Sequence, residues 1–121
     1  MTKTVLAVDD SQTMRDMVRF TLTSAGFDVR EAADGKLGLD ALKAGPGDVI
    51  ITDINMPNMN GIELVKAIRA EPAHRSTPSL ILTTEADAAK KDEGRAAGAT
   101  GWIVKPFDPA KLVQVVNKVC P

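Results

Sequence analysis

The stretch Val49-Ile50-Ile51-Thr52-Asp53 decides the fold class of this sequence. It places four consecutive β-branched residues before a carboxylate, without the alternation of polar and apolar residues that a half-exposed strand shows. A strand of this kind is buried on both faces, as strands are in parallel sheets covered by helices. Short runs of similar character occur at residues 5–8, 27–30, 80–83 and 102–104. The sequence therefore predicts five strands.

Segments with a helical spacing of apolar residues separate the predicted strands. One stripe joins residues 14, 17, 18 and 22, another residues 62, 65 and 68, and a third residues 112, 115, 116 and 119. Capping residues mark helix starts at Asp34, at Asn60 and at the pair Asp108-Pro109, and a fourth helix is predicted over residues 87–97. Five strand-helix repeats joined by right-handed crossovers predict a single α/β domain, a doubly wound five-stranded parallel sheet with five helices.

Composition limits the function. Fifteen Lys and Arg stand against 16 Asp and Glu in 121 residues, so the basic excess that binding to a nucleic-acid backbone needs is missing. The apolar run at residues 5–8 is too short for a secretory leader or a membrane span. Cys120 is the single cysteine, which excludes an internal disulfide. We expect one cytoplasmic domain over residues 1–121, with no output domain and with neither nucleic acid nor membrane as a partner.

Chemically reactive residues stand where the predicted strands end. They are Asp9 and Asp10 after the first strand, Asp53 after the third, Thr83 on the fourth and Lys105 after the fifth. Ligands of open parallel sheets bind at the carboxyl ends of the strands, so we expect these side chains to converge there. Crowded carboxylates repel one another, and Mg²⁺ would neutralise them while keeping positions open for phosphate oxygens. Lys105 would supply a second positive charge for a phosphoryl group.

A structural role competes with this interpretation for each residue taken alone. A lone aspartate after a strand is more often a helix N-cap than a metal ligand, and Asp10, which precedes Ser11, could be only that. Independent placement of surface residues would not put carboxylates, a hydroxyl and an ammonium all at strand ends. The joint pattern therefore favours a functional site.

Four stretches resemble the signature motifs of response-regulator receiver domains. They are Val8-Asp9-Asp10-Ser11, Thr52-Asp53-Ile54-Asn55-Met56-Pro57-Asn58-Met59-Asn60-Gly61, Thr83-Thr84-Glu85 and Val104-Lys105-Pro106-Phe107. The resemblance covers the whole chain in the family's order and spacing, and within the family the sequence is most similar to CheY-type chemotaxis regulators. It implies a flavodoxin-like sheet of strand order 2-1-3-4-5, for which this type of regulator is itself a standard example.

The resemblance implies a role for each strand-end residue. Asp53 would be the phosphoacceptor, taking a phosphoryl group from a phosphohistidine of a sensor histidine kinase. The Mg²⁺ ligands would be Asp9, Asp10, Asp53 and the backbone carbonyl of Asn55. Thr83 would hydrogen-bond one phosphoryl oxygen and Lys105 would pair with another. The Lys105-Pro106 bond would be cis.

The resemblance also implies a switch. Thr83 would move toward the phosphoryl group, and the aromatic side chain of the fifth strand would turn inward behind it. Trp102 stands at that position, where Tyr or Phe is usual, and its structural alternative is a half-buried aromatic that never moves. Asn55 and Glu85 match a pair found in regulators that dephosphorylate themselves quickly. The face made by the fourth helix, fifth strand and fifth helix would bind the target.

Three functions stay open. The first is a phosphorylation-switched, monomeric binding module with a CheA-like kinase as donor, a flagellar motor switch protein as target and a phosphatase as a further partner. The second is a phosphate-sink or docking receiver without motor output. The third is a haloacid-dehalogenase-type phosphatase, which Asn55 disfavours because that class has an acid/base Asp at this position. We expect a signalling switch, which catalyses only its own phosphotransfer and dephosphorylation, rather than an enzyme.

Overall fold

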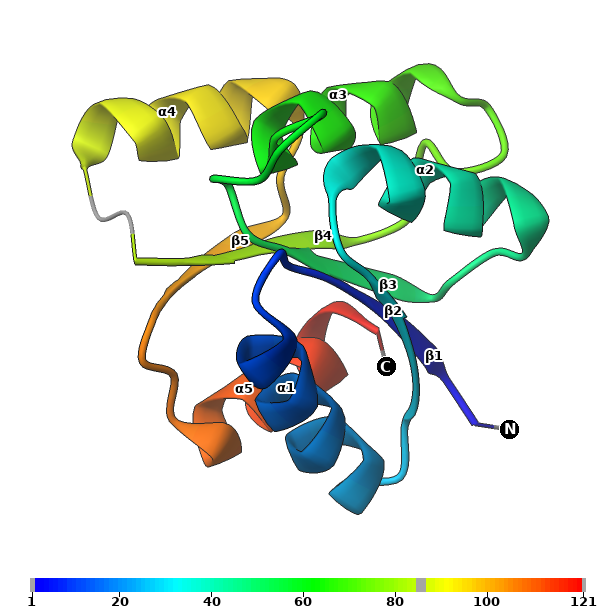
Figure 1. Cartoon of the computed structure of the whole chain (residues 1–121), viewed down its shortest axis with the longest axis vertical. Coiled ribbons are helices and arrows are strands. Elements are labelled where there is room, and N and C mark those ends of the chain that lie inside the picture. Colours follow the sequence, from blue (N-terminus) through cyan, green and yellow to red (C-terminus); the bar gives the residue numbers. More distant parts are fainter. Residues whose placement is uncertain (1, 85–86, 121) are drawn as a thin grey trace.

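Five strands and five helices alternate along the chain in the computed structural model, which describes residues 2–84 and 87–120 (Figure 1). The strands are β1 (Thr4–Val8), β2 (Asp28–Ala32), β3 (Val49–Thr52), β4 (Ser79–Thr83) and β5 (Gly101–Val104). The helices are α1 (Gln12–Ser24), α2 (Gly35–Ala44), α3 (Gly61–Ala70), α4 (Ala88–Ala97) and α5 (Pro109–Val119). All strands are parallel, in the order β2-β1-β3-β4-β5, so the predicted fold and strand order are confirmed.

Helices cover both faces of the sheet. Helices α1 and α5 pack on one face and α2, α3 and α4 on the other (Figure 1). From β1 the chain moves outward to β2 on one side of the sheet, and from β3 it moves outward to β4 and β5 on the other side. The helices that follow β1 and β3 therefore lie on opposite faces (Figure 1). Such a reversal opens a crevice at the carboxyl ends of the two strands, where ligands of this fold class bind. Among the described helices, none is long and apolar enough to cross a membrane.

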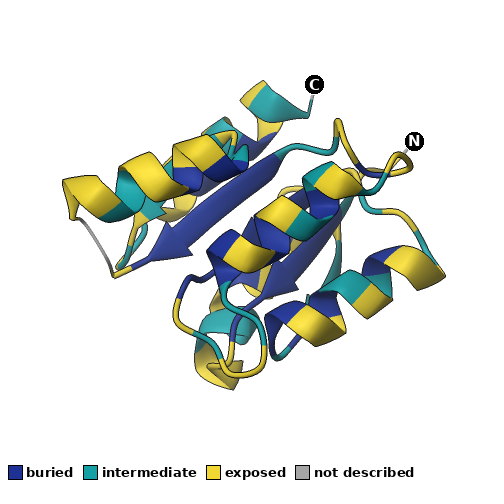
Figure 2. Cartoon of the chain, turned by 90° about the horizontal axis from the view of Figure 1, so that it is seen from above, coloured by how far each residue is buried: buried dark blue, intermediate teal, exposed yellow. Residues whose placement is uncertain are grey.

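The central strands form the core. Every residue of β3 and β4 is buried, whereas the helices bury one side only (Figure 2). Consecutive residues of a strand point to opposite faces, so Ile51 packs with Leu112 under α5 while Ile50 packs with Leu64 under α3. Burying such a side chain stabilises the fold by roughly 1.5–3 kcal/mol. The consecutive apolar residues 49–51 thus contribute to the core on both faces of the sheet.

Strand β2 differs from its prediction, which put it at residues 27–30. Phe27 belongs to the turn after α1, where its N–H donates to the carbonyl of Leu22 at 3.0 Å and its side chain joins the core. The strand instead runs on through Glu31 to Ala32, which pairs with the last residue of β1. β2 is an edge strand and carries polar residues, so a search for apolar runs does not find its bounds.

A side chain caps the start of every helix. The capping residues are Ser11, Asp34, Asn60, Asp87 and Asp108. The Ser11 hydroxyl accepts a hydrogen bond from the Met14 N–H at 3.2 Å, so Ser11 rather than Asp10 caps α1. The structural alternative considered for Asp10, a helix N-cap, is therefore wrong.

Candidate functional site

Three carboxylates meet where β1 and β3 end. Asp9 follows β1 and Asp53 follows β3, and these strands are neighbours. Hydrogen bonding between the strands continues through both residues, because the Asp53 N–H donates to the carbonyl of Val8 at 2.9 Å and the Asp9 N–H to that of Ala32 at 3.1 Å. One carboxylate oxygen from each of Asp9, Asp10 and Asp53 lies within 4.8 Å of the others. The structure thus brings together the aspartates that the sequence placed at strand ends.

The three carboxylates fit a hard divalent cation. All the donor atoms are oxygens and the cluster carries negative charge, which is the donor set that Mg²⁺ prefers. Asp9 and Asp53 are buried, with 5% and 9% of their surface exposed, whereas Asp10 is exposed. The cluster is therefore open to solvent on the Asp10 side. Asn55, also exposed, follows in the loop after β3.

Lys105 reaches the cluster from β5. Its Nζ donates to Asp9 Oδ2 at 2.8 Å and to Asp53 Oδ2 at 3.3 Å. The Lys105 N–H donates to the carbonyl of Thr83 at 2.8 Å, which fixes the backbone of Lys105 beside the end of β4. The Lys105-Pro106 bond is cis, as expected. Burial opposes the charge, but the hydrogen bond to Asp9 and the charge of Asp53 outweigh it and hold the pKa of Lys105 above its ordinary value. The ammonium is therefore charged at neutral pH.

Asp53 is fixed in position by its neighbours. Its Oδ1 accepts a hydrogen bond from the Ile54 N–H at 2.7 Å, while its Oδ2 faces Lys105. The start of α3 packs directly on its backbone, because a Cβ at Gly61 would lie 1.9 Å from the Asp53 carbonyl oxygen. A side chain at position 61 would therefore displace the backbone that carries the Asp53 carboxylate.

Thr83 and Trp102 lie on one face of the sheet. In the parallel register Thr83 stands beside Val104 and Ile81 beside Trp102, so the two residues are one strand and two positions apart. Thr83 is fully buried and Trp102 is half-buried. Glu85, the other predicted residue of this region, lies outside the described residues. Thr83 and Trp102 thus share the face of the sheet that α4 covers (Figure 1).

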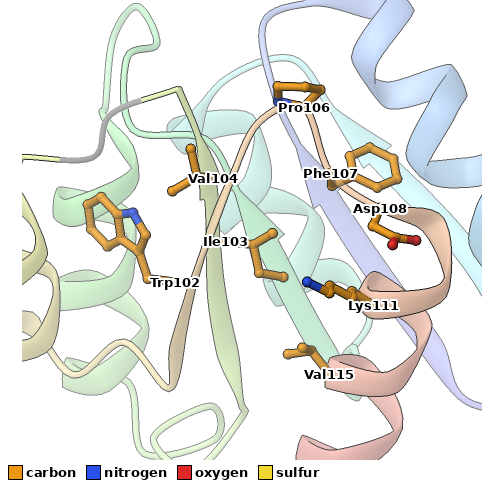
Figure 3. A pocket seen from close by; sticks show the side chains of 8 residues that line it. All are labelled: Trp102, Ile103, Val104, Pro106, Phe107, Asp108, Lys111 and Val115. Atoms are coloured by element: carbon orange, nitrogen blue, oxygen red, sulfur yellow. The ribbon is translucent and has the colours of Figure 1, made fainter.

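Trp102 lies between two open clefts. The first has a volume of about 380 Å³ and is lined by residues of β5, the following loop and α5, among them Phe107 and Lys111 (Figure 3). The second, also of about 380 Å³, lies beside α4 and is lined by Lys91 and Arg95. Figure 3 shows Trp102 and Ile103 on opposite sides of β5. The clefts give this surface aromatic, apolar and basic side chains together.

Sequence reasoning missed Arg15. This side chain lines a small crevice together with Asp9 and Asp53. Its guanidinium donates to the backbone carbonyl of Asp9 at 2.5 Å and to Glu31 of β2 at 3.3 Å. In the sequence, Arg15 is marked only by its position one turn into the helix that follows Asp10. That position does not by itself predict a contact with Asp9 at the carboxyl ends of the strands.

Comparisons with known proteins agree with this geometry. Residues 5–117 match the family model of the response regulator receiver domain. The chain belongs to this receiver family. The chemotaxis protein CheY-3 of Vibrio cholerae is 43% identical to it over 116 residues, which cover 95% of this chain and 89% of that protein. The solved structure of V. cholerae CheY4 at low pH shares 50% identity and a TM-score of 0.94, covering 98% of this chain and 99% of that one.

A more distant receiver domain adds a metal to the comparison. The receiver domain of a sensor histidine kinase from Pseudomonas aeruginosa PAO1 has a TM-score of 0.92 and 25% identity, covering 99% of this chain and 98% of that one. That structure has a magnesium ion coordinated in its active site cleft. The relatives at 43% and 50% identity are chemotaxis proteins, so this receiver domain is a response regulator of the CheY type.

Proposed function

We propose that this receiver domain works in a two-component system, where Asp53 accepts a phosphoryl group from a phosphohistidine of a sensor histidine kinase. The observation that carries the proposal is the approach of Lys105 Nζ to both Asp9 and Asp53, beside the third carboxylate of Asp10. Phosphoryl transfer needs positioning and neutralisation of charge more than it needs covalent chemistry. A fixed carboxylate beside a cation, at an edge open to water, supplies both.

Asp53 is the nucleophile of the transfer. One of its carboxylate oxygens bonds to phosphorus while the bond between phosphorus and the histidine nitrogen breaks, and that nitrogen leaves with the electron pair. The hydrogen bond from Ile54 and the contact with Lys105 orient the carboxylate for this attack. Lys105 then pairs with a phosphoryl oxygen, which stabilises the charge that spreads over the phosphoryl group.

Asp9, Asp10 and Asp53, with the backbone carbonyl of Asn55, would hold Mg²⁺. The donor set of the cluster and the magnesium ion in the Pseudomonas receiver domain support this assignment. When bound, the ion neutralises the carboxylates and the phosphoryl oxygens, so that a second anion can approach. Asn55 and Glu85 would in turn set how readily water reaches the phosphorus during dephosphorylation.

Phosphorylation would change the face formed by α4, β5 and α5. Thr83 is fully buried at the end of β4, and its hydroxyl would shift toward the phosphoryl group and donate to it. That shift vacates space on the sheet face that Trp102 shares, and the indole turns inward. The two clefts beside Trp102 then change shape together. A charge gained at Asp53 is thereby converted into a change of surface.

The target of this surface is a component of the flagellar motor switch, with a CheA-like kinase as donor and a phosphatase as a further partner. The chemotaxis role named for the Vibrio relatives supports this choice. The basic side chains of Lys91, Arg95 and Lys111 around the clefts favour a partner with acidic side chains beside its apolar anchors. A phosphate-sink receiver without motor output is the alternative within the same chemistry.

The domain acts as a signalling switch that catalyses only its own phosphotransfer and dephosphorylation. Asn55 stands two residues after Asp53, where a haloacid-dehalogenase-type phosphatase would need an aspartate as its acid and base. An amide cannot take up and return a proton at neutral pH. Asp9 and Asp10 would also lack a role in such an enzyme.

Transfer of radiolabel from an autophosphorylated CheA-type kinase tests the proposed function. Label should move to the wild-type chain and not to Asp53→Asn. Pull-down with phosphorylated and unphosphorylated chain then separates the two outputs. Preferential capture of a flagellar switch component by the phosphorylated form supports the motor role. Removal of phosphoryl groups from the kinase, with no phosphorylation-dependent capture of a partner, supports the phosphate-sink receiver.

A further inference from the structure

A partly buried contact joins the start of α2 to the loop between β3 and α3. The side chain of Asn58 donates from Nδ2 to Oδ2 of Asp34 at 2.9 Å. The next residue of each segment extends this contact, because the Gly35 N–H donates to the backbone carbonyl of Met59 at 3.1 Å. We call Asp34 and Asn58 the α2 clasp. It ties together two segments that are 24 residues apart in the sequence.

Both carboxylate oxygens of Asp34 are used. Oδ1 accepts from the Leu37 N–H at 2.8 Å and thereby caps α2, which leaves Oδ2 for Asn58. Asp34 is buried, with 6% of its surface exposed. The hydrogen bond from Leu37, followed by the one from Asn58, lowers the pKa of Asp34, so the carboxylate is ionised and accepts both bonds at neutral pH.

The backbone around the clasp leaves no spare room. A Cβ at Gly35 would lie 2.4 Å from the carbonyl oxygen and 2.9 Å from the side chain of Met59, so the start of α2 lies directly against the loop. Asn58 has a φ of 69°, in the left-handed region that asparagine tolerates better than most residues. The loop therefore has a defined shape at this point, and the two hydrogen bonds to α2 hold it.

The clasp is one of two anchors on either side of Asn55. On the near side, Ile54 is held by its N–H bond to Asp53 and by the Gly61 N–H, which donates to the Ile54 carbonyl at 2.9 Å. On the far side the anchor is the clasp at Asn58. Mg²⁺ demands near-ideal octahedral geometry, so small displacements of a ligand weaken its binding.

We propose that Asp34 and Asn58 are positioning residues, which hold the loop after β3 so that the backbone carbonyl of Asn55 stands where a divalent cation needs it. The inference rests on the proposed function, because it presumes that the acidic cluster binds Mg²⁺. Asp34 does not touch the cation. It acts through Asn58 and the loop, as the groups that orient metal ligands do elsewhere.

An exchange of the two side chains tests the proposal. In Asp34→Ser the hydroxyl oxygen can still cap α2, but the shorter side chain has no second oxygen to accept from Asn58. Isothermal titration calorimetry should show Mg²⁺ binding weakened by roughly tenfold. In the double variant Asp34→Asn/Asn58→Asp the amide caps α2 with its oxygen and donates to the new carboxylate, so affinity should return to within about twofold of wild type.

Controls separate position from charge. Asp40→Asn removes an exposed carboxylate from the same helix and should leave Mg²⁺ affinity nearly unchanged. Asn58→Asp alone adds a carboxylate but breaks the clasp, and it should bind Mg²⁺ more weakly than wild type. Asn58→Gly keeps the backbone conformation accessible, deletes the donor and should show the same loss. In each clasp variant, labelling by a small phosphodonor should need more Mg²⁺ but reach the wild-type rate at saturation.

Three results would overturn the proposal. They are unchanged affinity in Asp34→Ser, a loss that the double variant does not recover, and tighter binding in Asn58→Asp, which would show that charge sets the affinity. Should Asp34→Ser lower the melting temperature strongly, Asn58→Gly decides the question in the same way. A wild-type chain that binds no Mg²⁺ would overturn the proposed function and this inference together, whereas the three results above would overturn the inference alone.

Discussion

The indole of Trp102 packs directly against Gly94 of α4. A Cβ at Gly94 would lie 3.0 Å from the indole Cζ3 and 2.9 Å from Cδ1 of Ile81, closer than side chains ordinarily approach. The missing side chain at position 94 is what lets α4 lie against β4 and β5 beside so large an aromatic residue. Movement of the indole and displacement of α4 are therefore coupled by packing.

Gly94→Ala should disturb this packing. Alanine is the better helix former by about 1 kcal/mol, but its methyl group must push aside Trp102 and Ile81. We expect the free energy of unfolding in urea to fall by roughly 1 kcal/mol despite the gain in helix propensity, and the emission of Trp102 to shift.

Two variants control this experiment. Ala96→Gly, on the exposed side of α4, should cost about 1 kcal/mol through helix propensity alone and leave the Trp102 emission unchanged. Gly94→Ala combined with Trp102→Phe should recover part of the lost stability, measured by circular dichroism. A Gly94→Ala protein more stable than wild type would contradict the packing argument.

Trp102 is the single tryptophan, so its fluorescence reports the switch. If phosphorylation at Asp53 draws Thr83 toward the phosphoryl group, the indole moves to a drier environment. Its emission wavelength and its accessibility to a soluble quencher should then change, and the signal should decay without added phosphatase. Mg²⁺ alone should have much less effect. An unchanged spectrum in a sample shown to be mostly phosphorylated would refute the movement of Trp102.

Lys105→Met would leave Asp9 and Asp53 without the ammonium between them. Losing these charge-assisted hydrogen bonds should lower the free energy of unfolding in EDTA by roughly 1.5–3 kcal/mol. The raised pKa of Lys105 means that its contribution is complete below the ordinary value of 10.5 and is lost only as pH rises through the raised one. Measurements at pH 7 therefore capture it fully.

Magnesium should affect Lys105→Met more than wild type. The cation then meets no competing ammonium in the acidic cluster, so its stabilising increment, measured by thermal unfolding with and without Mg²⁺, should grow. Lys111→Met, at an exposed position on α5, is the matched control and should keep the wild-type increment. A smaller increment in Lys105→Met would show that the ammonium does not compete for these carboxylates.

Asp34 should make stability depend on acid pH. Because its pKa is lowered in the folded chain, its contribution is present above the ordinary value of 3.8 and is lost as pH falls through the lowered one. The difference in free energy of unfolding between wild type and Asp34→Asn should therefore be largest near neutral pH and shrink below 3.8. Urea titrations between neutral and acid pH measure it, with Asp40→Asn as the baseline for losing one carboxylate. A difference that grows on acidification would contradict the assigned direction.

The apolar runs of the sequence predicted the central strands because those strands are buried on both faces, as Val49–Thr52 shows. They misplaced β2, since Arg30 and Glu31 of this edge strand make ion pairs and hydrogen bonds with neighbouring helices instead of entering the core. Edge strands bury less apolar surface, so their bounds depend on pairing with the neighbouring strand rather than on composition.

Residues at strand ends could be placed from sequence, but contacts between distant side chains could not. Lys105 and Asp9 are 96 residues apart, and their places at strand ends predicted that they converge, but not that Lys105 Nζ donates to Asp9. Gly94 could be read as a weak point of α4, whereas the structure shows that Trp102 requires it. The sequence does not indicate the hydrogen bond between Asn58 and Asp34. Asn58 is explained locally as a turn residue and Asp34 as a helix cap, so neither residue requires a distant partner.

Mass spectrometry tests the central claim most directly. The chain is incubated with a small phosphodonor and Mg²⁺, digested, and the added phosphoryl group is located. We predict a single adduct on Asp53, absent from Asp53→Asn and blocked by EDTA, because unneutralised carboxylates repel the incoming group. An adduct on His74, on a serine or on a threonine, or labelling of Asp53 that does not depend on Mg²⁺, would contradict the account.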